Sequence, residues 1–267
     1  MKPISKTAFY CCGVRMQDAE RDNPVCGDNY AKVFMNEQGL QIVEAFKDEK
    51  RPNASNVARH RIVDDILRQE LLAHPNLTIV IIGAGFDTRA FRLTGGTWVE
   101  LDEPQVITYK DERLPASTSQ NELHRIAIDF ATDSLEEKLA AFSNRNPVAV
   151  VIEGVFMYLD QAAIVKLLET LHHVFPDHKL ICDLMTREFF EKNARTIHEK
   201  LTGMGATFKF TIDHPEQVFL KSGYRVIDTI PIVEKAVRFS MPRMPEIVWK
   251  VLRRMLPLGY SIFVFRT

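Results

Sequence analysis

The stretch from Thr78 to Asp102 constrains the fold of this chain most. Its first part, Ile79 to Ile82, is a run of β-branched residues without polar alternation, which is typical of a strand buried on both faces of a parallel sheet. The run ends at Gly83-Ala84-Gly85, where glycines let the backbone approach a ligand closely. A second strand, Thr97 to Leu101, ends at Asp102. This order predicts the nucleoside-binding half of an open α/β sheet, with Asp102 accepting hydrogen bonds from ribose hydroxyls.

The residues around the glycine turn favour S-adenosylmethionine over a dinucleotide. A dinucleotide needs the pattern G-x-G-x-x-G/A and a bare helix N-terminus that faces its pyrophosphate. Here Thr88 stands at the third glycine position, and the carboxylate of Asp87 would repel a diphosphate, although Arg89 partly offsets that charge. S-Adenosylmethionine has no phosphate, and its sulfonium and ammonium groups suit neighbouring acids. Two alternatives stay open: an NAD site, and a turn that only lets a helix pack on the sheet, with Asp87 as its N-cap.

The composition argues against several other classes of protein. The 267 residues carry a net charge of −1, so no basic field indicates binding to nucleic acid. No apolar stretch is long enough to span a bilayer, and the first residues lack the apolar core of a signal peptide. The four cysteines show no C-x-x-C spacing, so we expect reduced thiols, no metal site and a cytoplasmic protein. A disulfide from Cys26 to Cys11 or Cys12 stays open.

The order of the patterns predicts a single α/β domain in four parts. Residues 1–75 form a helical extension, 76–186 the cofactor-binding core, 187–222 an insertion that caps a substrate pocket, and 223–267 the closing strands and helix. We expect seven strands in a mostly parallel, Rossmann-like sheet with helices on both faces, the plan of class I methyltransferases. The last two strands could form an antiparallel edge. We expect the helix from Glu246 to Leu256 to pack on the core rather than lie on a membrane surface.

The helix predicted from Ala54 to Ala73 carries an arginine on its apolar face. Arg59 precedes Ile62, Val63 and Ile66 by three, four and seven residues, so it shares their side of the helix. A guanidinium at the inner end of a buried face needs an anion. That anion is either a nearby acidic side chain or the carboxylate of the cofactor's methionine part, held as a bidentate pair.

Two further acids follow strands of the predicted sheet. Asp129 comes after the strand from Leu123 to Ile128, and Glu153 comes after the apolar strand from Val148 to Ile152. Ligand-contacting residues collect at the carboxyl ends of parallel strands, so Asp129 is placed to accept a hydrogen bond from the adenine amine. We expect Glu153 in the middle of the crevice, in contact with the cofactor, paired with Arg59, or both.

The segment from Arg187 to about Thr211 mixes aromatic residues, charges and glycines. That composition suits an insertion that caps a pocket, while the alternative is that its aromatic residues simply complete the core. We predict substrate contacts from Arg187, His198 and Phe208 in this insertion, and from Tyr158 before it.

Taken together, the motifs resemble the leucine carboxyl methyltransferase family, including its bacterial polyketide O-methyltransferase-like branch. The resemblance covers nearly the whole chain and rests on five motifs: Val57-Ala58-Arg59, Gly83 to Arg89, Glu100 to Pro104, Asp129-Phe130 and Glu153 to Leu159. It implies S-adenosylmethionine-dependent methylation of an oxygen, often a carboxylate. The Asp-Thr-Arg loop is more similar to the small-molecule branch than to the members that act on a protein C-terminus. Relatives vary most in the acceptor cap, so the resemblance does not name the acceptor.

The resemblance also implies roles for individual residues. It assigns cofactor contacts as follows: Arg59 to the carboxylate, Gly83, Ala84 and Gly85 to the methionine part, Asp102 to the ribose, Asp129 and the backbone at Phe130 to adenine, Glu153 to a further contact, and Lys6 by a looser alignment. The charge argument above adds Asp87 to the predicted cofactor contacts.

Methyl transfer from a sulfonium is an in-line displacement. An ionised carboxylate acceptor needs no base, and the enzyme then contributes alignment and removal of water. A phenol acceptor would benefit from a base, for which His198 and Tyr158 are the candidates. We predict that no single side chain is an indispensable base. The competing functions are an NAD-dependent oxidoreductase and a non-catalytic nucleoside-binding protein on the same fold.

Overall fold

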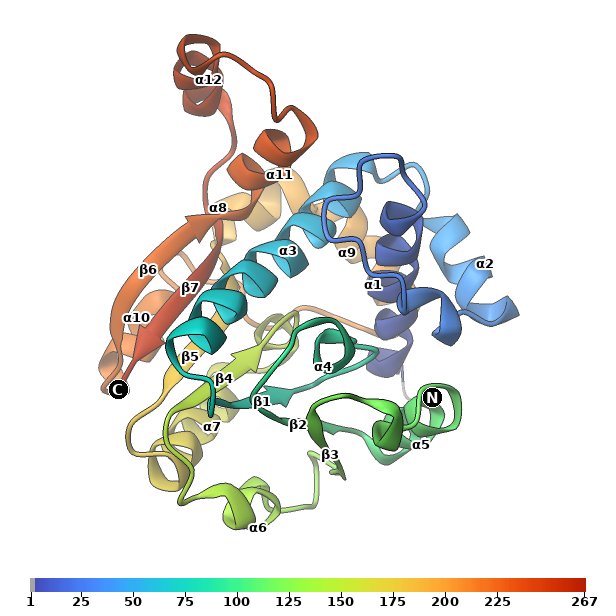
Figure 1. Cartoon of the computed structure of the whole chain (residues 1–267). Coiled ribbons are helices and arrows are strands. Elements are labelled where there is room, and N and C mark those ends of the chain that lie inside the picture. Colours follow the sequence, from blue (N-terminus) through green and yellow to red (C-terminus); the bar gives the residue numbers. More distant parts are fainter. Residues whose placement is uncertain (1–2) are drawn as a thin grey trace.

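One twisted sheet of seven strands organises the computed structural model, which describes residues 3–267 and the side chains from residue 6 onward (Figure 1). The strand order is β3-β2-β1-β4-β5-β7-β6. The strands are β1 Thr78–Ile82, β2 Thr97–Asp102, β3 Glu122–Ala127, β4 Val148–Ile152, β5 Lys179–Met185, β6 Arg225–Pro231 and β7 Tyr260–Arg266. The pairs among β1 to β5 are parallel, and β7 is antiparallel to both β5 and β6. The predicted Rossmann-like, mostly parallel fold is therefore confirmed.

Helices precede the first strand in the sequence, alternate with the strands and follow β5, and together they cover both faces of the sheet. The elements before the sheet are α1 Pro3–Ala19, η1 Ala31–Phe34, α2 Glu37–Ala45 and α3 Lys50–Ala73. Those within the core are α4 Arg89–Arg92, α5 Pro104–Arg113, η2 Ala116–Thr118, α6 Leu135–Leu139, η3 Ala140–Phe142, η4 Phe156–Tyr158 and α7 Gln161–Val174. Those after β5 are α8 Arg187–Phe189, the π-helix η5 Phe190–Ala194, α9 Arg195–Gly203, α10 Glu216–Lys221, α11 Ile232–Ser240, α12 Glu246–Leu252 and η6 Arg253–Met255.

The core lies on both faces of the sheet, as the unbroken apolar run of β1 predicts. All five residues of β1 are buried. Ile79 and Ile81 belong to the cluster that includes apolar residues of α3 and α11, whereas Val80 and Ile82 belong to the cluster that includes α7. The alternation arises because successive side chains of a strand point to opposite faces. This packing fixes the carboxyl end of β1, and with it the glycine loop that follows.

The prediction that the helix from Glu246 to Leu256 packs on the core is wrong. In the structure α12 stands away from the sheet, at the tip of an excursion between α11 and β7 (Figure 1). Ile247, Val251 and Met255 are 76%, 62% and 78% exposed, and Trp249 is the buried residue of α12. The helix that covers the sheet here is α11, which contacts α3 and β7. Apolar periodicity shows that a helix has an apolar side, but not what that side faces.

Two observations bear on the expectations from composition. Within residues 3–267, no helix has both the length and the apolar character that crossing a bilayer requires. All four cysteines, at positions 11, 12, 26 and 182, are free thiols.

Candidate functional site

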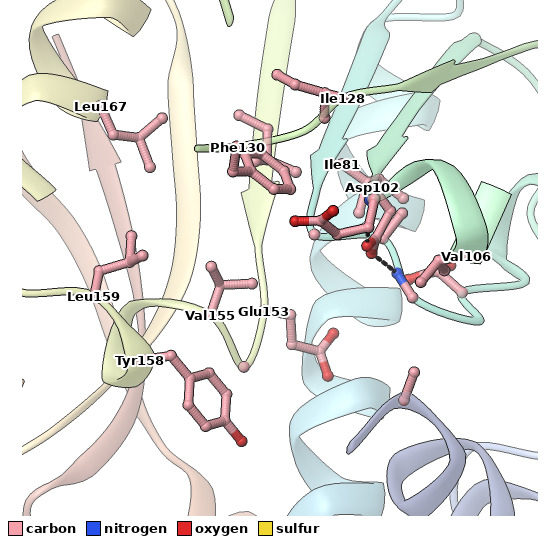
Figure 2. Close-up of a pocket in the computed structure, with 18 of the residues that line it drawn as sticks. Ile81, Asp102, Val106, Ile128, Phe130, Glu153, Val155, Tyr158, Leu159 and Leu167 are labelled. Atoms are coloured by element: carbon pink, nitrogen blue, oxygen red, sulfur yellow. Dashed lines mark hydrogen bonds between the residues drawn. The ribbon is translucent and has the colours of Figure 1, made fainter. Parts of the chain in front are cut away.

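A cavity of about 860 Å³ lies at the carboxyl ends of β1, β2 and β4 (Figure 2). The predicted site residues that line it are Arg59, Gly83, Ala84, Gly85, Asp87, Asp102, Phe130, Glu153 and Tyr158. They come from α3, the glycine loop, three strand ends and the turn after β4, so segments far apart in the sequence meet here. The cavity falls in the size range of small-molecule sites. Lys6, Asp129, Arg187, His198 and Phe208 are not among the residues that line it.

The glycine loop adopts a backbone that a side chain would disturb. Gly83 has φ +70° and Gly85 has φ +46°, both in the left-handed region that favours glycine. A Cβ on Gly83 would lie 2.5 Å from Cγ2 of Val155, which belongs to the turn after β4. The close approach of the two loops therefore depends on the missing Cβ.

Asp102 holds the glycine loop and also faces the cavity. Its Oδ2 accepts a hydrogen bond from the Gly85 N–H at 2.6 Å, and its Oδ1 accepts one from the Glu103 N–H at 2.7 Å. Burial raises the pKa of the Asp102 carboxyl, and these two N–H groups oppose that rise. Each carboxylate oxygen still has a lone pair for a further donor. The position suits the predicted ribose contact, which stays a prediction.

The helix N-terminus that a pyrophosphate would need is closed by a side chain. The Oδ1 of Asp87 accepts a hydrogen bond from the backbone N–H of Arg89 at 2.7 Å, and α4 has only four residues. The Asp87 carboxylate also pairs with the Arg89 guanidinium. A negative group thus occupies the position where a diphosphate binds in dinucleotide sites, so the loop does not offer the usual anion site.

Arg59 pairs with two acidic side chains of the protein, Glu153 and Asp183. Its Nε donates to Glu153 Oε1 at 3.0 Å, and its Nη1 donates to Asp183 Oδ2 at 3.2 Å and to the Tyr260 hydroxyl at 2.8 Å. Its Nη2 lies 4.0 Å from Sγ of Cys11, which also lines the cavity. The salt bridge is therefore present, and Nη2 is the part of the guanidinium with the fewest contacts. The spacing could not indicate Asp183 or Tyr260, because both come from strands late in the chain.

Glu153 lies between two buried guanidiniums. Its Oε1 accepts from Arg59, and its Oε2 accepts from Arg89 Nη2 at 2.7 Å. Burial alone would raise the pKa of Glu153, but Arg89 and Arg59 outweigh it and hold that pKa well below its ordinary value. Glu153 is therefore ionised at neutral pH and holds the cavity wall together.

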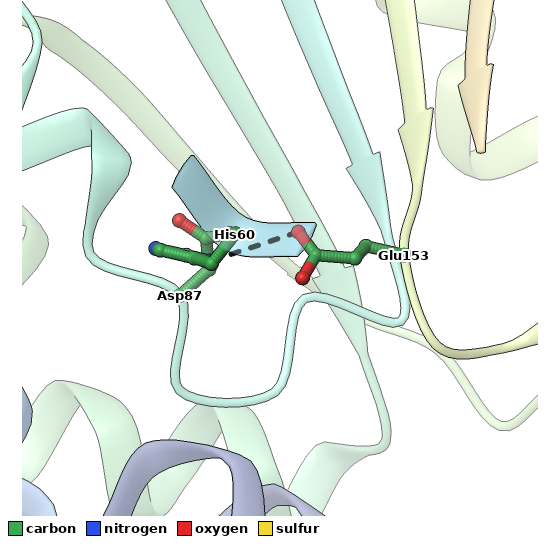
Figure 3. A group of neighbouring side chains, drawn as sticks. All are labelled: His60, Asp87 and Glu153. Atoms are coloured by element: carbon green, nitrogen blue, oxygen red, sulfur yellow. Dashed lines mark ion pairs between the residues drawn. The ribbon is translucent and has the colours of Figure 1, made fainter. Parts of the chain in front are cut away.

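His60, Asp87 and Glu153 converge from α3, the glycine loop and the end of β4 (Figure 3). Their potential ligand atoms lie within 4.8 Å of one another, which resembles a metal site in composition. The Arg89 guanidinium already occupies the centre: its Nη2 lies 2.8 Å from His60 Nδ1 and 2.7 Å from Glu153 Oε2, and its Nη1 pairs with Asp87. Burial and the neighbouring Arg89 lower the pKa of His60, so the ring is neutral. The cluster is thus an arginine-centred ion network.

Sequence reasoning missed a second part of this network, which ties α1 to the glycine loop. Arg15 Nε donates to Asp28 Oδ2 at 2.9 Å, and its Nη2 donates to the Phe86 carbonyl at 2.7 Å. Asp28 also accepts from the Thr88 hydroxyl at 2.7 Å. Burial would raise the pKa of Asp28, but Arg15 and Arg92 lower it to about 2. No pattern in the sequence pairs these residues, since each lies in a different segment.

The network continues from the glycine loop to α3. Asp64 accepts from Arg89 Nε at 2.7 Å and from Arg92 Nη1 at 2.6 Å, and it is fully buried. Arg89 and Arg92 lie on the short helix α4, one turn apart. The leading helices therefore fix the position of the glycine loop through ion pairs, in addition to apolar packing.

The two residues predicted for adenine differ in position. Phe130 lines the cavity (Figure 2), and it is 45% exposed. Asp129 Oδ1 accepts a hydrogen bond from the Ala131 N–H at 3.0 Å, so this carboxylate shapes the turn after β3. The N-cap of the following helix, α6, is Ser134, whose hydroxyl accepts from the Glu137 N–H.

The predicted substrate residues lie in different surroundings. Tyr158 lines the cavity, and Phe208 packs edge-on against it with the ring centroids 5.3 Å apart. His198 accepts from the Phe208 N–H at 3.1 Å, whereas Arg187 is exposed and lies 3.7 Å from Asp213. From the segment predicted to be an insertion, residues 187–222, Gly205 contributes to the cavity wall.

Known proteins match this chain in sequence. A family model described as leucine carboxyl methyltransferase matches residues 8–172. A curated protein of Mycobacteroides abscessus is 32% identical over 184 residues, 63% of this chain, and one of Mycobacterium tuberculosis is 29% identical over 179 residues, 60% of this chain. Both are named, provisionally, as S-adenosyl-L-methionine-dependent methyltransferases. The matched stretch spans about three fifths of these relatives' length.

Solved structures match the fold at low sequence identity. A duf574 family protein from Streptomyces avermitilis has a TM-score of 0.63 at 13% identity and covers 95% of this chain and 99% of its own. The magnesium protoporphyrin IX methyltransferase of Synechocystis, solved with bound S-adenosylhomocysteine, has a TM-score of 0.51 at 11% identity and covers 91% and 95%. These likenesses concern the fold alone.

Proposed function

This chain belongs to the leucine carboxyl methyltransferase family, and on that premise we propose that it binds S-adenosylmethionine in the cavity and transfers the methyl group to an oxygen of a small molecule. The observation that carries the proposal is the placement of Arg59 and Asp102 in the walls of one cavity, with the glycine loop between them in the chain. A guanidinium suits the amino-acid carboxylate, and an acid suits the ribose hydroxyls.

The charge around the loop supports this cofactor over NAD. Asp87 closes the N-terminus of α4, so a diphosphate would meet a carboxylate rather than free N–H groups. The sulfonium and ammonium groups of S-adenosylmethionine are cations, which neighbouring acids favour. The names of the curated relatives agree with this cofactor. The cavity volume of about 860 Å³ is near the upper end for small-molecule sites and leaves room for an acceptor beside the cofactor.

Neither of the two candidate bases, Tyr158 and His198, is suited to remove a proton from the acceptor, which favours an acceptor that is already ionised. Burial raises the pKa of Tyr158, so its hydroxyl keeps its proton at neutral pH. His198 does not line the cavity, and its Nε2 already accepts a hydrogen bond from Phe208 N–H. A carboxylate acceptor needs no base, and the reaction then requires alignment and exclusion of water. We therefore propose a carboxylate as the acceptor, with an acidic hydroxyl as the alternative.

Calorimetric titration of S-adenosylmethionine tests the binding site. Arg59→Met and Asp102→Ala should each lower affinity at least about tenfold, because each loses a charge-assisted hydrogen bond to the cofactor. Arg187→Met, which removes an exposed guanidinium outside the cavity, is the matched control and should keep the parent's affinity. Thermal melts identify any variant that fails to fold. Parent affinity in both cavity variants would refute the site, and tight binding of NADH instead would favour the oxidoreductase.

Mass spectrometry tests the reaction. Small metabolites incubated with the protein and a methyl-labelled donor should include a species that gains one methyl group on oxygen. Tight cofactor binding without transfer to any acceptor pool would favour the non-catalytic nucleoside-binding protein.

A further inference from the structure

The excursion between α11 and β7, residues 241–258, forms an arm that carries an apolar face away from the core. It contains α12 and η6 and projects beyond α11 in Figure 1. Its exposed apolar residues are Met241, Ile247, Val248, Val251, Met255 and Leu258. None of them lines the cavity, so the arm is not a wall of the proposed active site.

The exposed face has regular spacing. Ile247, Val251 and Met255 follow one another at intervals of four residues, so they lie on one side of the helical segment. Solvent-exposed apolar residues scattered singly are common, whereas a contiguous patch indicates an interaction surface. The patch lies in the connection between β6 and β7, which pair as antiparallel neighbours in the sheet. Joining two such neighbours does not require an arm of this length.

The arm is anchored by its other face, which makes its orientation a property of the fold. Trp249 is buried, and the Arg238 guanidinium on α11 lies 5.4 Å from the centroid of its ring. Arg238 also pairs with Glu246 and donates to the Met244 carbonyl at 3.2 Å. The aromatic and ionic contacts therefore turn the aliphatic face outward.

Cations surround the exposed face. Arg243, Lys250, Arg253 and Arg254 are all exposed, and none of the four forms an ion pair with another of the side chains described, those of residues 6–267. The one acid of the arm, Glu246, is paired with Arg238. With four cations and one acid, the arm has a net charge of +3, although the whole chain has −1. Positive charge is thus concentrated where the apolar side chains are exposed.

We propose that this arm docks on an anionic lipid surface. Apolar side chains flanked by unpaired cations match such a surface, because the former enter the acyl boundary and the latter bind phosphate headgroups. A second copy of the chain fits less well, since a symmetric contact through this face would bring the cations of two arms together. The proposal does not depend on the methyltransferase function.

Sedimentation of the purified full-length chain with vesicles tests the proposal. The parent should bind vesicles of phosphatidylcholine mixed with phosphatidylglycerol, bind pure phosphatidylcholine much more weakly, and lose affinity as salt rises. Ile247→Ser/Val251→Ser/Met255→Ser should weaken binding about tenfold or more. Arg253→Gln/Arg254→Gln should weaken it about thirtyfold, which corresponds to about 1 kcal/mol for each cation near the surface.

Matched controls change the same chemistry elsewhere. Leu72→Ser removes an exposed apolar side chain from α3, and Lys192→Gln/Arg195→Gln removes two exposed cations from η5 and α9. Both controls should bind anionic vesicles like the parent. Absence of binding by the parent, or equal binding by the arm variants, would overturn the proposal. A dimer in analytical ultracentrifugation that the triple serine variant abolishes, without vesicle binding, would assign the face to a second copy instead.

Discussion

Arg59 and Glu153 are 94 positions apart in the sequence, yet Nε of the first donates a hydrogen bond to Oε1 of the second at 3.0 Å. The pair joins the helix that precedes the sheet to the end of its fourth strand. Glu153 also accepts from Arg89 on the glycine-loop side, so one carboxylate links three segments of the cavity wall. The geometry of the proposed cofactor site therefore depends on long-range ion pairs as well as on the strand ends.

Glu153→Ala should destabilise the fold by about 3–5 kcal/mol, because it leaves the buried guanidiniums of Arg59 and Arg89 without a shared partner. Urea unfolding at neutral pH measures the change. Glu188→Ala, which removes an exposed carboxylate paired with Lys192, should stay within about 0.5 kcal/mol of the parent. A cost for Glu153→Ala below about 1 kcal/mol would contradict this account of the network.

Gly83→Ala should destabilise the fold by about 2 kcal/mol or more, because the new Cβ would lie 2.5 Å from Val155 Cγ2 in a backbone with φ +70°. It should also weaken binding of S-adenosylmethionine, since the loop must shift. Gly203→Ala is the control, because its Cβ would meet no heavy atom within 4 Å. Thermal melts and calorimetric titration of both variants check the difference. Equal stability in the two would show that the loop approach is not constrained.

His178 should make stability fall as the pH drops from about 6.5 towards 4. The ring is buried; its Nδ1 lies 2.6 Å from the Phe175 carbonyl oxygen and its Nε2 lies 2.8 Å from the Tyr224 hydroxyl. Burial lowers the pKa of His178 from 6.5 to about 4, although the Phe175 carbonyl opposes this. As the pH falls, the unfolded chain protonates this histidine before the folded chain does. The contribution of the neutral His178 ring to the free energy of unfolding is therefore complete above pH 6.5 and declines below it, by at most about 3 kcal/mol.

Urea unfolding between pH 7.5 and 4 measures that decline. In His178→Gln the free energy of unfolding should be lower at neutral pH but should change less across this window. The exposed His74→Gln should keep the slope of the parent. A His178→Gln profile parallel to that of the parent would argue against a buried neutral ring.

Tyr158→Phe should keep turnover within about threefold of the parent. Burial raises the pKa of the Tyr158 hydroxyl, so it does not act as a base at neutral pH. Formation of S-adenosylhomocysteine with the acceptor found in the labelling experiment measures the rate, and Tyr30→Phe, outside the cavity, is the control. A loss of about a hundredfold with unchanged cofactor affinity would identify Tyr158 as a general acid or base.

The sequence alone determined the sheet and its glycine loop. The apolar runs from Ile79 to Ile82 and from Val148 to Ile152 predicted strands buried on both faces, and β1 and β4 lie side by side at the centre. The positions of Asp102 and Glu153 at the carboxyl ends of strands followed from the parallel plan, and both line the cavity, whereas Asp129, predicted on the same ground, does not. These features depend on local periodicity and on the rule for parallel sheets, both of which can be read from the order of residues.

Only the tertiary structure decided which charges meet and which apolar faces stay exposed. Arg15, Asp28 and Asp64 gave no signal in the sequence, yet their contacts hold the glycine loop against the segments that precede the sheet. The helix from Glu246 had the same apolar periodicity as α3 has, but it lies outside the core. A pattern records the character of each side of a helix. What each side of the helix contacts is set by the packing of segments that are distant in the chain, because burial and ion pairing depend on where those segments meet.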